Sequence, residues 1–181
     1  MPETPRDELP DDYLRALGRI VVNFARLEHF LRVSIIFLLG DDQRIGSLVT
    51  AELSMGQLLK VLSSLVRLRM HEASKLKEFD QLRIRAEKLD TRRGLIMHSS
   101  WAHPGHWADS SGVDPATHAM RTKTTAKVRK GLQYQFEHFT SDDLHQLADE
   151  IRQVSGKLLN FTDDLVKAQK EGRSPPFTGR A

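Results

Sequence analysis

The sequence has no cysteine among its 181 residues. Without thiols the chain can form neither a disulfide framework nor a thiolate zinc site, and it can hold no cysteine nucleophile. Any metal site would have to use histidine, aspartate or glutamate side chains. The absence therefore excludes zinc fingers, disulfide-stapled domains and cysteine-dependent enzymes.

Long apolar runs are also missing. The stretch VSIIFLLG at residues 33–40 is far shorter than the roughly 20 residues that a membrane-spanning helix needs. The first residues, MPETPRDELPDDYL, are acidic and lack the basic-then-apolar order of a signal peptide. We therefore expect a cytoplasmic protein that makes no membrane contact.

Neither sign of charge dominates the chain. Lys and Arg total 27 and Asp and Glu total 24, and the net charge of +3 is too small to identify a partner. The content of 39% hydrophobic and 28% charged residues is ordinary for a globular protein, and this length suits one domain. Prolines in residues 1–10, and Gly, Ser and Pro-Pro in residues 169–181, predict frayed ends around a single domain at residues 11–168.

Four stretches of the chain carry apolar residues at helical spacing. The first ends at Gly40, the second is a broken region at residues 43–70 with Gly46 and Gly56 as candidate interruptions, and the third covers residues 74–99. The stripe of the first helix is expected to contain Leu14, Leu17, Val21, Phe24, Leu31, Ile35 and Leu38. Helices with such stripes must bury them against one another, which predicts an all-α, up-and-down bundle of four to five helices.

The fourth helix has the most regular pattern. Thr140 is its expected N-cap, and Asp142 and Asp143 stand in the first turn, where carboxylates favour the positive end of the helix dipole. Its apolar seam consists of Leu144, Leu147, Ile151, Val154, Leu158, Phe161 and Leu165.

Residues 119–139, before the fourth helix, predict a small β-hairpin insertion with its turn near Lys130 and Gly131. Four basic residues of the first strand share one face, namely Arg121, Lys123, Lys127 and Arg129. Such a row would bind the phosphates of a nucleic acid, with an affinity that falls steeply with salt. A solvated edge strand that its lysines protect from aggregation is an equally good interpretation.

Two opposite charges interrupt the apolar stripes. Glu28 stands where the first stripe should continue between Phe24 and Leu31, and Arg93 stands on the third stripe between Leu89 and Ile96. A charge buried alone costs several kcal/mol, and pairing with further hydrogen bonds offsets much of that cost. We therefore predict that Glu28 and Arg93 contact each other, either as a structural ion pair or as part of a functional site.

His98 follows Arg93 by five residues, at the point where the third helix should end. With this Arg-x4-His spacing at the end of a core helix, and with an acidic residue on the first helix, the chain resembles the HEPN family of helical-bundle proteins over most of residues 12–165. The family commonly has Asn, Asp or His after the arginine, whereas this chain has Gly94.

The resemblance implies a metal-independent endoribonuclease whose two subunits share one cleft. In it His98 would move protons between ribose and phosphate oxygens, Arg93 would hold the scissile phosphate, and Glu28 would orient the arginine. Because the ribose 2′-OH would be the nucleophile, DNA should not be cut. Bacterial proteins of this kind are often toxins or phage-defence effectors, and a toxin would have a cognate antitoxin as a partner.

Arg92 and Trp101 are expected to assist RNA binding, Trp101 by stacking on a base unless its ring packs over the end of the bundle. No metal or other cofactor is expected. His98, His103, His106 and Asp109 lie close together in the sequence, but Pro104 and Gly105 make the segment a loop in which nothing orients the imidazoles together. Two alternatives stay open: an inert HEPN-like interaction module, which Gly94 favours, and a protein that binds nucleic acid through the basic hairpin.

Overall fold

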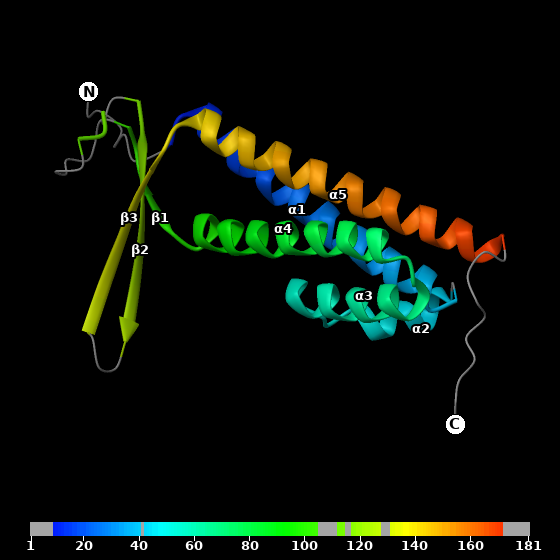
Figure 1. Ribbon diagram of the computed structural model, residues 1–181. Helices are drawn as coiled ribbons and strands as arrows, with labels where there is room; N and C mark the ends of the chain where they lie inside the picture. Colours follow the sequence, from blue (N-terminus) through cyan, green and yellow to red (C-terminus); the bar gives the residue numbers. More distant parts are fainter. Residues whose placement is uncertain (1–8, 41, 105–111, 115–116, 128–130, 172–181) are drawn as a thin grey trace. The chain divides into compact units, whose positions relative to one another are not determined.

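The computed structural model of the protein describes residues 9–40, 42–104, 112–114, 117–127 and 131–171 (Figure 1). The predicted helical class and the predicted hairpin are both confirmed, although the chain is not purely α. The helices are α1 (Asp11–Leu38), α2 (Gln43–Thr50), α3 (Met55–Arg69), α4 (Ala73–Met97) and α5 (Ser141–Lys170), and the strands are β1 (Ser100–Ala102), β2 (Ala119–Lys127) and β3 (Gly131–Phe139). Among the described residues, no helix is both long enough and apolar enough to cross a membrane.

Contacts within the chain divide it into two compact units. The first unit contains residues 1–22 and 91–150, and the second contains residues 23–90 and 151–181. Helices α1, α4 and α5 each supply residues to both units. The sheet belongs entirely to the first unit, and α2 and α3 belong entirely to the second.

One face of α1 is buried along the whole helix. The predicted stripe is correct from Phe24 onward, but Leu14 and Val21 in its first half are 49% and 47% exposed. The buried apolar residues recur in steps of three, four and four, an 11-residue repeat close to the natural period of an α-helix. They are Tyr13, Ala16, Ile20, Phe24, Leu27, Leu31, Ile35 and Leu38.

In the second unit, the broken region at residues 43–70 is two helices, and the break falls at residues 51–54 rather than at Gly46 or Gly56. The Ser54 side chain accepts a hydrogen bond from the Gln57 amide, and the Gln57 side chain accepts one from the Ser54 amide. This capping box satisfies two of the amides that the start of α3 leaves without a helical partner. A new helix therefore begins at Met55.

In the first unit, the sheet is antiparallel with the strand order β1-β2-β3. The hairpin formed by β2 and β3 covers the predicted residues 119–139, and Gly131 has the positive φ (66°) that glycine adopts without strain. Strand β1 was not predicted, because the histidine-rich segment that contains it was expected to be a loop. Three residues are too few to show the alternation by which a strand is recognised.

The seam of α5 is confirmed, since all seven of its predicted residues are buried. Its N-cap is confirmed as well: the Thr140 hydroxyl accepts a hydrogen bond from the Asp143 amide (3.1 Å), and the Asp143 carboxylate accepts one from the Thr140 amide (2.8 Å). This reciprocal pair has the form of a capping box with an aspartate in place of the usual glutamate.

The start of α1 is tied to the hairpin within the first unit. The Tyr13 hydroxyl lies 3.0 Å from the carbonyl oxygens of both Thr117 and Phe139 and donates its proton to them. Burial is the main reason that the pKa of Tyr13 is raised above its ordinary value. The phenol is therefore a neutral donor that fixes the last residue of β3.

Candidate functional site

The C-terminal end of α4 carries the residue that the sequence singled out as a proton-transfer group. Helix α4 ends at Met97, and the His98 amide still donates to the Gly94 carbonyl (3.3 Å) as in a helix. The His98 side chain is exposed. The helix does not loosen near Gly94, so the five-residue spacing leaves the Arg93 and His98 side chains roughly 140° apart around the helix axis.

The last carbonyl groups of α4 find side-chain donors. The Leu95 carbonyl accepts hydrogen bonds from the Ser99 hydroxyl and from Arg121 Nη1 (3.2 Å), and the Ile96 carbonyl accepts one from Trp101 Nε1 (3.2 Å). A helix normally leaves its last four carbonyls without internal partners. Side chains from the following turn, β1 and β2 therefore fix the helix end, and with it the turn that carries His98.

The placement of Arg121 corrects one prediction. Arg121 was expected in an exposed basic row, but its side chain is fully buried. Its Nη2 atom forms an ion pair with Glu137 Oε1 at 2.8 Å, away from hydrogen-bond directions, while Nη1 donates to the Ser99 hydroxyl (2.9 Å). The cause is the register, because Arg121 occupies the middle strand with Trp101 beside it on β1 and Glu137 on β3. A guanidinium enclosed in this way cannot reach a phosphate.

The other predicted RNA-binding residues have different surroundings. Arg92 is exposed and forms a long ion pair with Glu150, at 4.0 Å. Lys123 is half-buried and lies on the same face of β2 as Arg121. Lys127 is the last residue of β2, and Arg129 lies outside the described residues.

Trp101 is in a packing environment. Its ring is half-buried and lies 5.6 Å from the ring of Phe139, tilted by 53°. With its indole N–H already donated to the Ile96 carbonyl, the side chain supports the end of α4. This placement fits the packing interpretation of Trp101 better than the stacking interpretation.

Arg93 and Glu28 belong to different units, so their predicted contact stays a prediction. Arg93 is half-buried with a buried Nε atom, and its spacing from Leu89 and Ile96 keeps it on the seam of α4. Glu28 is half-buried but does not occupy the seam of α1, because Leu27 does. The expectation that Glu28 interrupts that seam is therefore wrong by one residue.

The described residues contain no group of three or more His, Asp or Glu side chains that could hold a metal ion. Two members of the histidine-rich segment considered in the sequence, His106 and Asp109, lie outside the described residues.

A chain of polar side chains that the sequence did not suggest joins α1 to α5 in the first unit. Arg19 Nη1 lies 2.8 Å from His145 Nδ1, and Arg19 Nη2 lies 2.6 Å from Asp149 Oδ1. On the other side of the ring, His145 Nε2 lies 3.1 Å from Asp12 Oδ1. Hydrogen bonds from Ser141 and then from His145 hold the pKa of Asp12 below its ordinary value. More than 120 residues separate the α1 and α5 partners along the chain, so no local sequence pattern could have predicted these contacts.

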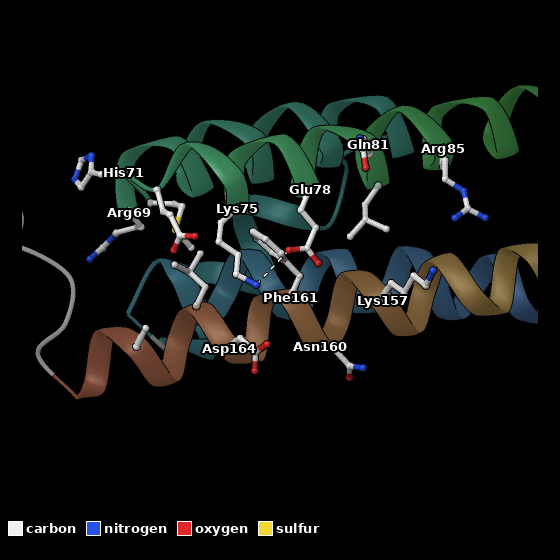
Figure 2. A pocket seen from close by; sticks show the side chains of 15 residues that line it. Arg69, His71, Lys75, Glu78, Gln81, Arg85, Lys157, Asn160, Phe161 and Asp164 are labelled. Atoms are coloured by element: carbon white, nitrogen blue, oxygen red, sulfur yellow. Dashed lines mark hydrogen bonds and ion pairs between the residues drawn. The ribbon is translucent and has the colours of Figure 1, made fainter.

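A groove of about 730 Å³ lies in the second unit, between the first half of α4 and the last part of α5 (Figure 2). Lys75 and Glu78 extend from α4 towards α5 and form an ion pair at 3.2 Å, and Phe161 of α5 packs 5.5 Å from Phe79. The volume suits a small ligand, but such sites are usually lined predominantly by apolar side chains, whereas nearly half of the residues around this groove are charged, with both signs present. None of the predicted site residues lines it.

No protein-family model matches the chain, and no curated protein or solved structure is significantly similar to it. The interpretation of the site therefore depends on the residues of this chain.

Proposed function

We propose that the protein is a metal-independent endoribonuclease of the HEPN type that acts as a homodimer. The observation that carries this proposal is the exposed imidazole of His98 at the fixed C-terminal end of α4, one and a half turns after the half-buried Arg93. A general acid–base group has to be open to substrate and held in place, and the side-chain donors at the end of α4 meet the second condition.

The proposed reaction needs no metal ion. One His98 accepts the proton of a ribose 2′-OH, whose oxygen attacks the adjacent phosphorus and forms a 2′,3′-cyclic phosphate. The bond from phosphorus to the 5′ oxygen breaks, and a second imidazole gives that oxygen a proton. Arg93 holds the phosphate and balances the charge that develops on its oxygens, with Glu28 orienting the guanidinium.

Two protein chains are needed for this chemistry. Within one chain the continuous helix keeps Arg93 and His98 on different sides of α4, and one imidazole cannot serve as base and acid in the same step. A second copy, with its own His98, would supply the missing group. Two copies arranged around a shared cleft resolve both difficulties.

Gly94 supports a second candidate, an inert module that keeps the fold and binds partners or nucleic acid without cutting. The glycine stands where the resembled family commonly has a polar side chain. A Cβ atom added at Gly94 would meet no heavy atom within 4 Å, so the space for such a side chain exists. Gly94→Asn is therefore a direct test of whether a polar group there increases cleavage.

The deciding experiment incubates the purified protein with end-labelled RNA and the matching DNA in EDTA. We expect RNA to be cut into products that end in a cyclic phosphate, DNA to stay intact, and His98→Ala to lose the activity at least a hundredfold, as expected for removal of a general acid–base group. His103→Ala is the control, because that histidine is close in sequence but absent from the proposed reaction. Cleavage by His98→Ala at the rate of the parent would refute the mechanism.

A further inference from the structure

One face of the β2–β3 hairpin exposes a row of apolar side chains, Leu132, Tyr134 and Phe136, which we call the aromatic face. These side chains are 63%, 57% and 54% exposed, and the rings of Tyr134 and Phe136 lie 6.4 Å apart and nearly parallel, at 10°. A contiguous apolar row in contact with water marks an interaction surface, whereas single exposed apolar residues need no explanation.

The charge of the hairpin indicates what the aromatic face binds. Residues 119–139 contain five basic residues and one acidic residue, and the ion pair of Arg121 with Glu137 neutralises one of each. In the sequence, the hairpin then has four further basic residues, Lys123, Lys127, Arg129 and Lys130, and no further acidic one. Two copies of the hairpin brought together would add like charges, whereas a polyanion would complement them.

Lys123 and the aromatic face lie on opposite faces of the hairpin. The register places Lys123 beside Gln135, and Tyr134 beside Thr124 on the other face. Beyond Thr122, where β1 ends, the hairpin is only two strands wide. Sheets pack about 10 Å apart face to face, which is close to the Debye length of about 8 Å at physiological salt, so charges on one face of the hairpin still attract a polyanion on the other face.

The aromatic face also lies close to the end of α4. Ser100 of β1 is paired with Thr122, which is paired with Phe136, so these three residues form one row across the sheet. At about 4.8 Å between neighbouring strands, Phe136 is roughly 10 Å from β1. Strand β1 begins only two residues after His98.

We propose that the aromatic face binds an unpaired segment of RNA by stacking its bases on Tyr134 and Phe136, and that this brings a neighbouring nucleotide to His98. Single-stranded nucleic acids are commonly bound by aromatic side chains that stack on bases together with basic residues that attract the phosphates. Delivery to His98 depends on the proposed ribonuclease function, but binding to the aromatic face does not. The substrate class is single-stranded RNA, because paired bases are already stacked on one another and cannot lie on the rings.

The test measures fluorescence anisotropy with 5′-labelled oligo(dT) and oligo(U), each about 12 nucleotides long, in EDTA. Oligo(dT) has the same stacking surfaces but no 2′-OH, so it binds without being cut. Tyr134→Ala and Phe136→Ala should each weaken binding of both probes by about 5- to 100-fold, the range that loss of a base–aromatic stack produces. Tyr134→Phe and Phe136→Tyr keep the rings and should bind like the parent.

Two further variants give the matched controls. Gln133→Ala and Gln135→Ala lie on the opposite face of the same strand and should leave binding unchanged. Lys123→Gln should reduce the dependence of affinity on salt, whereas the alanine variants of the rings should lower affinity and leave the salt dependence unchanged.

Binding of oligo(dT) by Tyr134→Ala and Phe136→Ala at the parent's affinity would overturn the proposal. So would a change of Tyr134→Ala from dimer to monomer with intact oligonucleotide binding, which would identify the aromatic face as a contact between two copies. If both rings are needed for binding but oligo(U) is never cut, the ribonuclease function fails and the binding surface stands. If the variants without the rings cut oligo(U) as fast as the parent, the ribonuclease function stands and delivery of RNA by the aromatic face fails.

Discussion

Arg121 Nη1 lies 3.2 Å from the carbonyl oxygen of Leu95, so an arginine from the middle strand of the sheet caps the C-terminal end of α4. Cations are stabilising at helix C-termini, where the backbone dipoles concentrate negative charge. The same guanidinium reaches Ser99, on the far side of His98 in the chain. It therefore holds both flanks of the turn that carries the imidazole.

Replacing Arg121 by methionine should destabilise the protein by about 2 kcal/mol, because the variant loses hydrogen bonds that a charged group makes to partly buried acceptors. Urea denaturation followed by circular dichroism measures the change. Lys123→Met is the matched control, two residues later on the same face of β2, and should change stability by less than about 0.5 kcal/mol. Equal losses in the two variants would show that the burial and hydrogen bonds of Arg121 contribute nothing.

Gly94→Ala should raise the free energy of unfolding by about 0.5–1 kcal/mol, because alanine loses less conformational freedom than glycine inside a helix. Gly94 is in the last part of α4, and an added Cβ meets no heavy atom within 4 Å. The midpoint of urea denaturation reports the gain. A lower midpoint would mean that the backbone at Gly94 departs from regular helix.

Gly46→Ala should have the opposite effect and destabilise the second unit by about 1–3 kcal/mol, the usual cost of overpacking. A Cβ at Gly46 would lie 2.5 Å from Cγ1 of Ile36, so the side chain of α1 or the backbone of α2 must shift. The same denaturation experiment measures this loss. Ile36→Ala removes Cγ1 and leaves only the Cβ of residue 36, at 3.1 Å, so the cost of Gly46→Ala should fall in that background. An unchanged cost would mean that the clash with Ile36 is not what destabilises the variant.

Helical periodicity predicted α5 correctly but misplaced the first half of α1. Thr140 and the seam of α5 were predicted correctly, because capping and a 3.6-residue repeat are local signals. The first half of α1 was misassigned by one position. Leu14 and Leu17 are more apolar than their neighbours Tyr13 and Ala16, which are the residues actually buried, and Ile20 is buried in place of the equally apolar Val21. When two adjacent faces of a helix are both apolar, the elements that pack against the helix determine which face is buried.

The hairpin illustrates a different limit. Leu132, Tyr134 and Phe136 alternate with polar residues in the sequence, which predicts a strand with one apolar and one polar face. The alternation could not show which of the two faces is covered by the rest of the protein. The structure buries Arg121 on one face and exposes the rings on the other. The face with Arg121 is the covered one because it lies against the end of α4, where Arg121 donates a hydrogen bond to the carbonyl of Leu95, 26 residues earlier in the chain.

The position of His98 was predictable, since a helical stripe that ends near residue 97 places the next residue in a turn. Its supports were not predictable. Trp101 donates to the end of α4 from a three-residue strand that was not predicted. Arg121 does so from a buried position, and arginine is rarely buried.

Asp143 should contribute to the loss of folding stability at low pH. A hydrogen bond from the Thr140 hydroxyl (2.7 Å), followed by one from the Thr140 amide, holds the pKa of Asp143 below its ordinary value of 3.8. A carboxyl with a lowered pKa stabilises the folded state only while it is ionised. Its contribution is therefore fully present above about pH 4 and is lost as the pH falls through the pKa of the folded state.

Asp143→Asn should accordingly cost roughly 0.3–1 kcal/mol at pH 7, as expected for a carboxylate in the first turn of a helix, and the difference from the parent should narrow as the pH falls below 3.8. Urea denaturation at a series of pH values from 7 to 2.5 measures this difference. Asp142→Asn, one residue earlier in the same turn, is the control, because Asp142 does not take part in the capping pair with Thr140. Suppose that Asp143→Asn were less stable than the parent by the same amount at pH 2.5 as at pH 7. The loss would then come from the shape of the asparagine side chain, and the ionised carboxylate would not be what stabilises the start of α5.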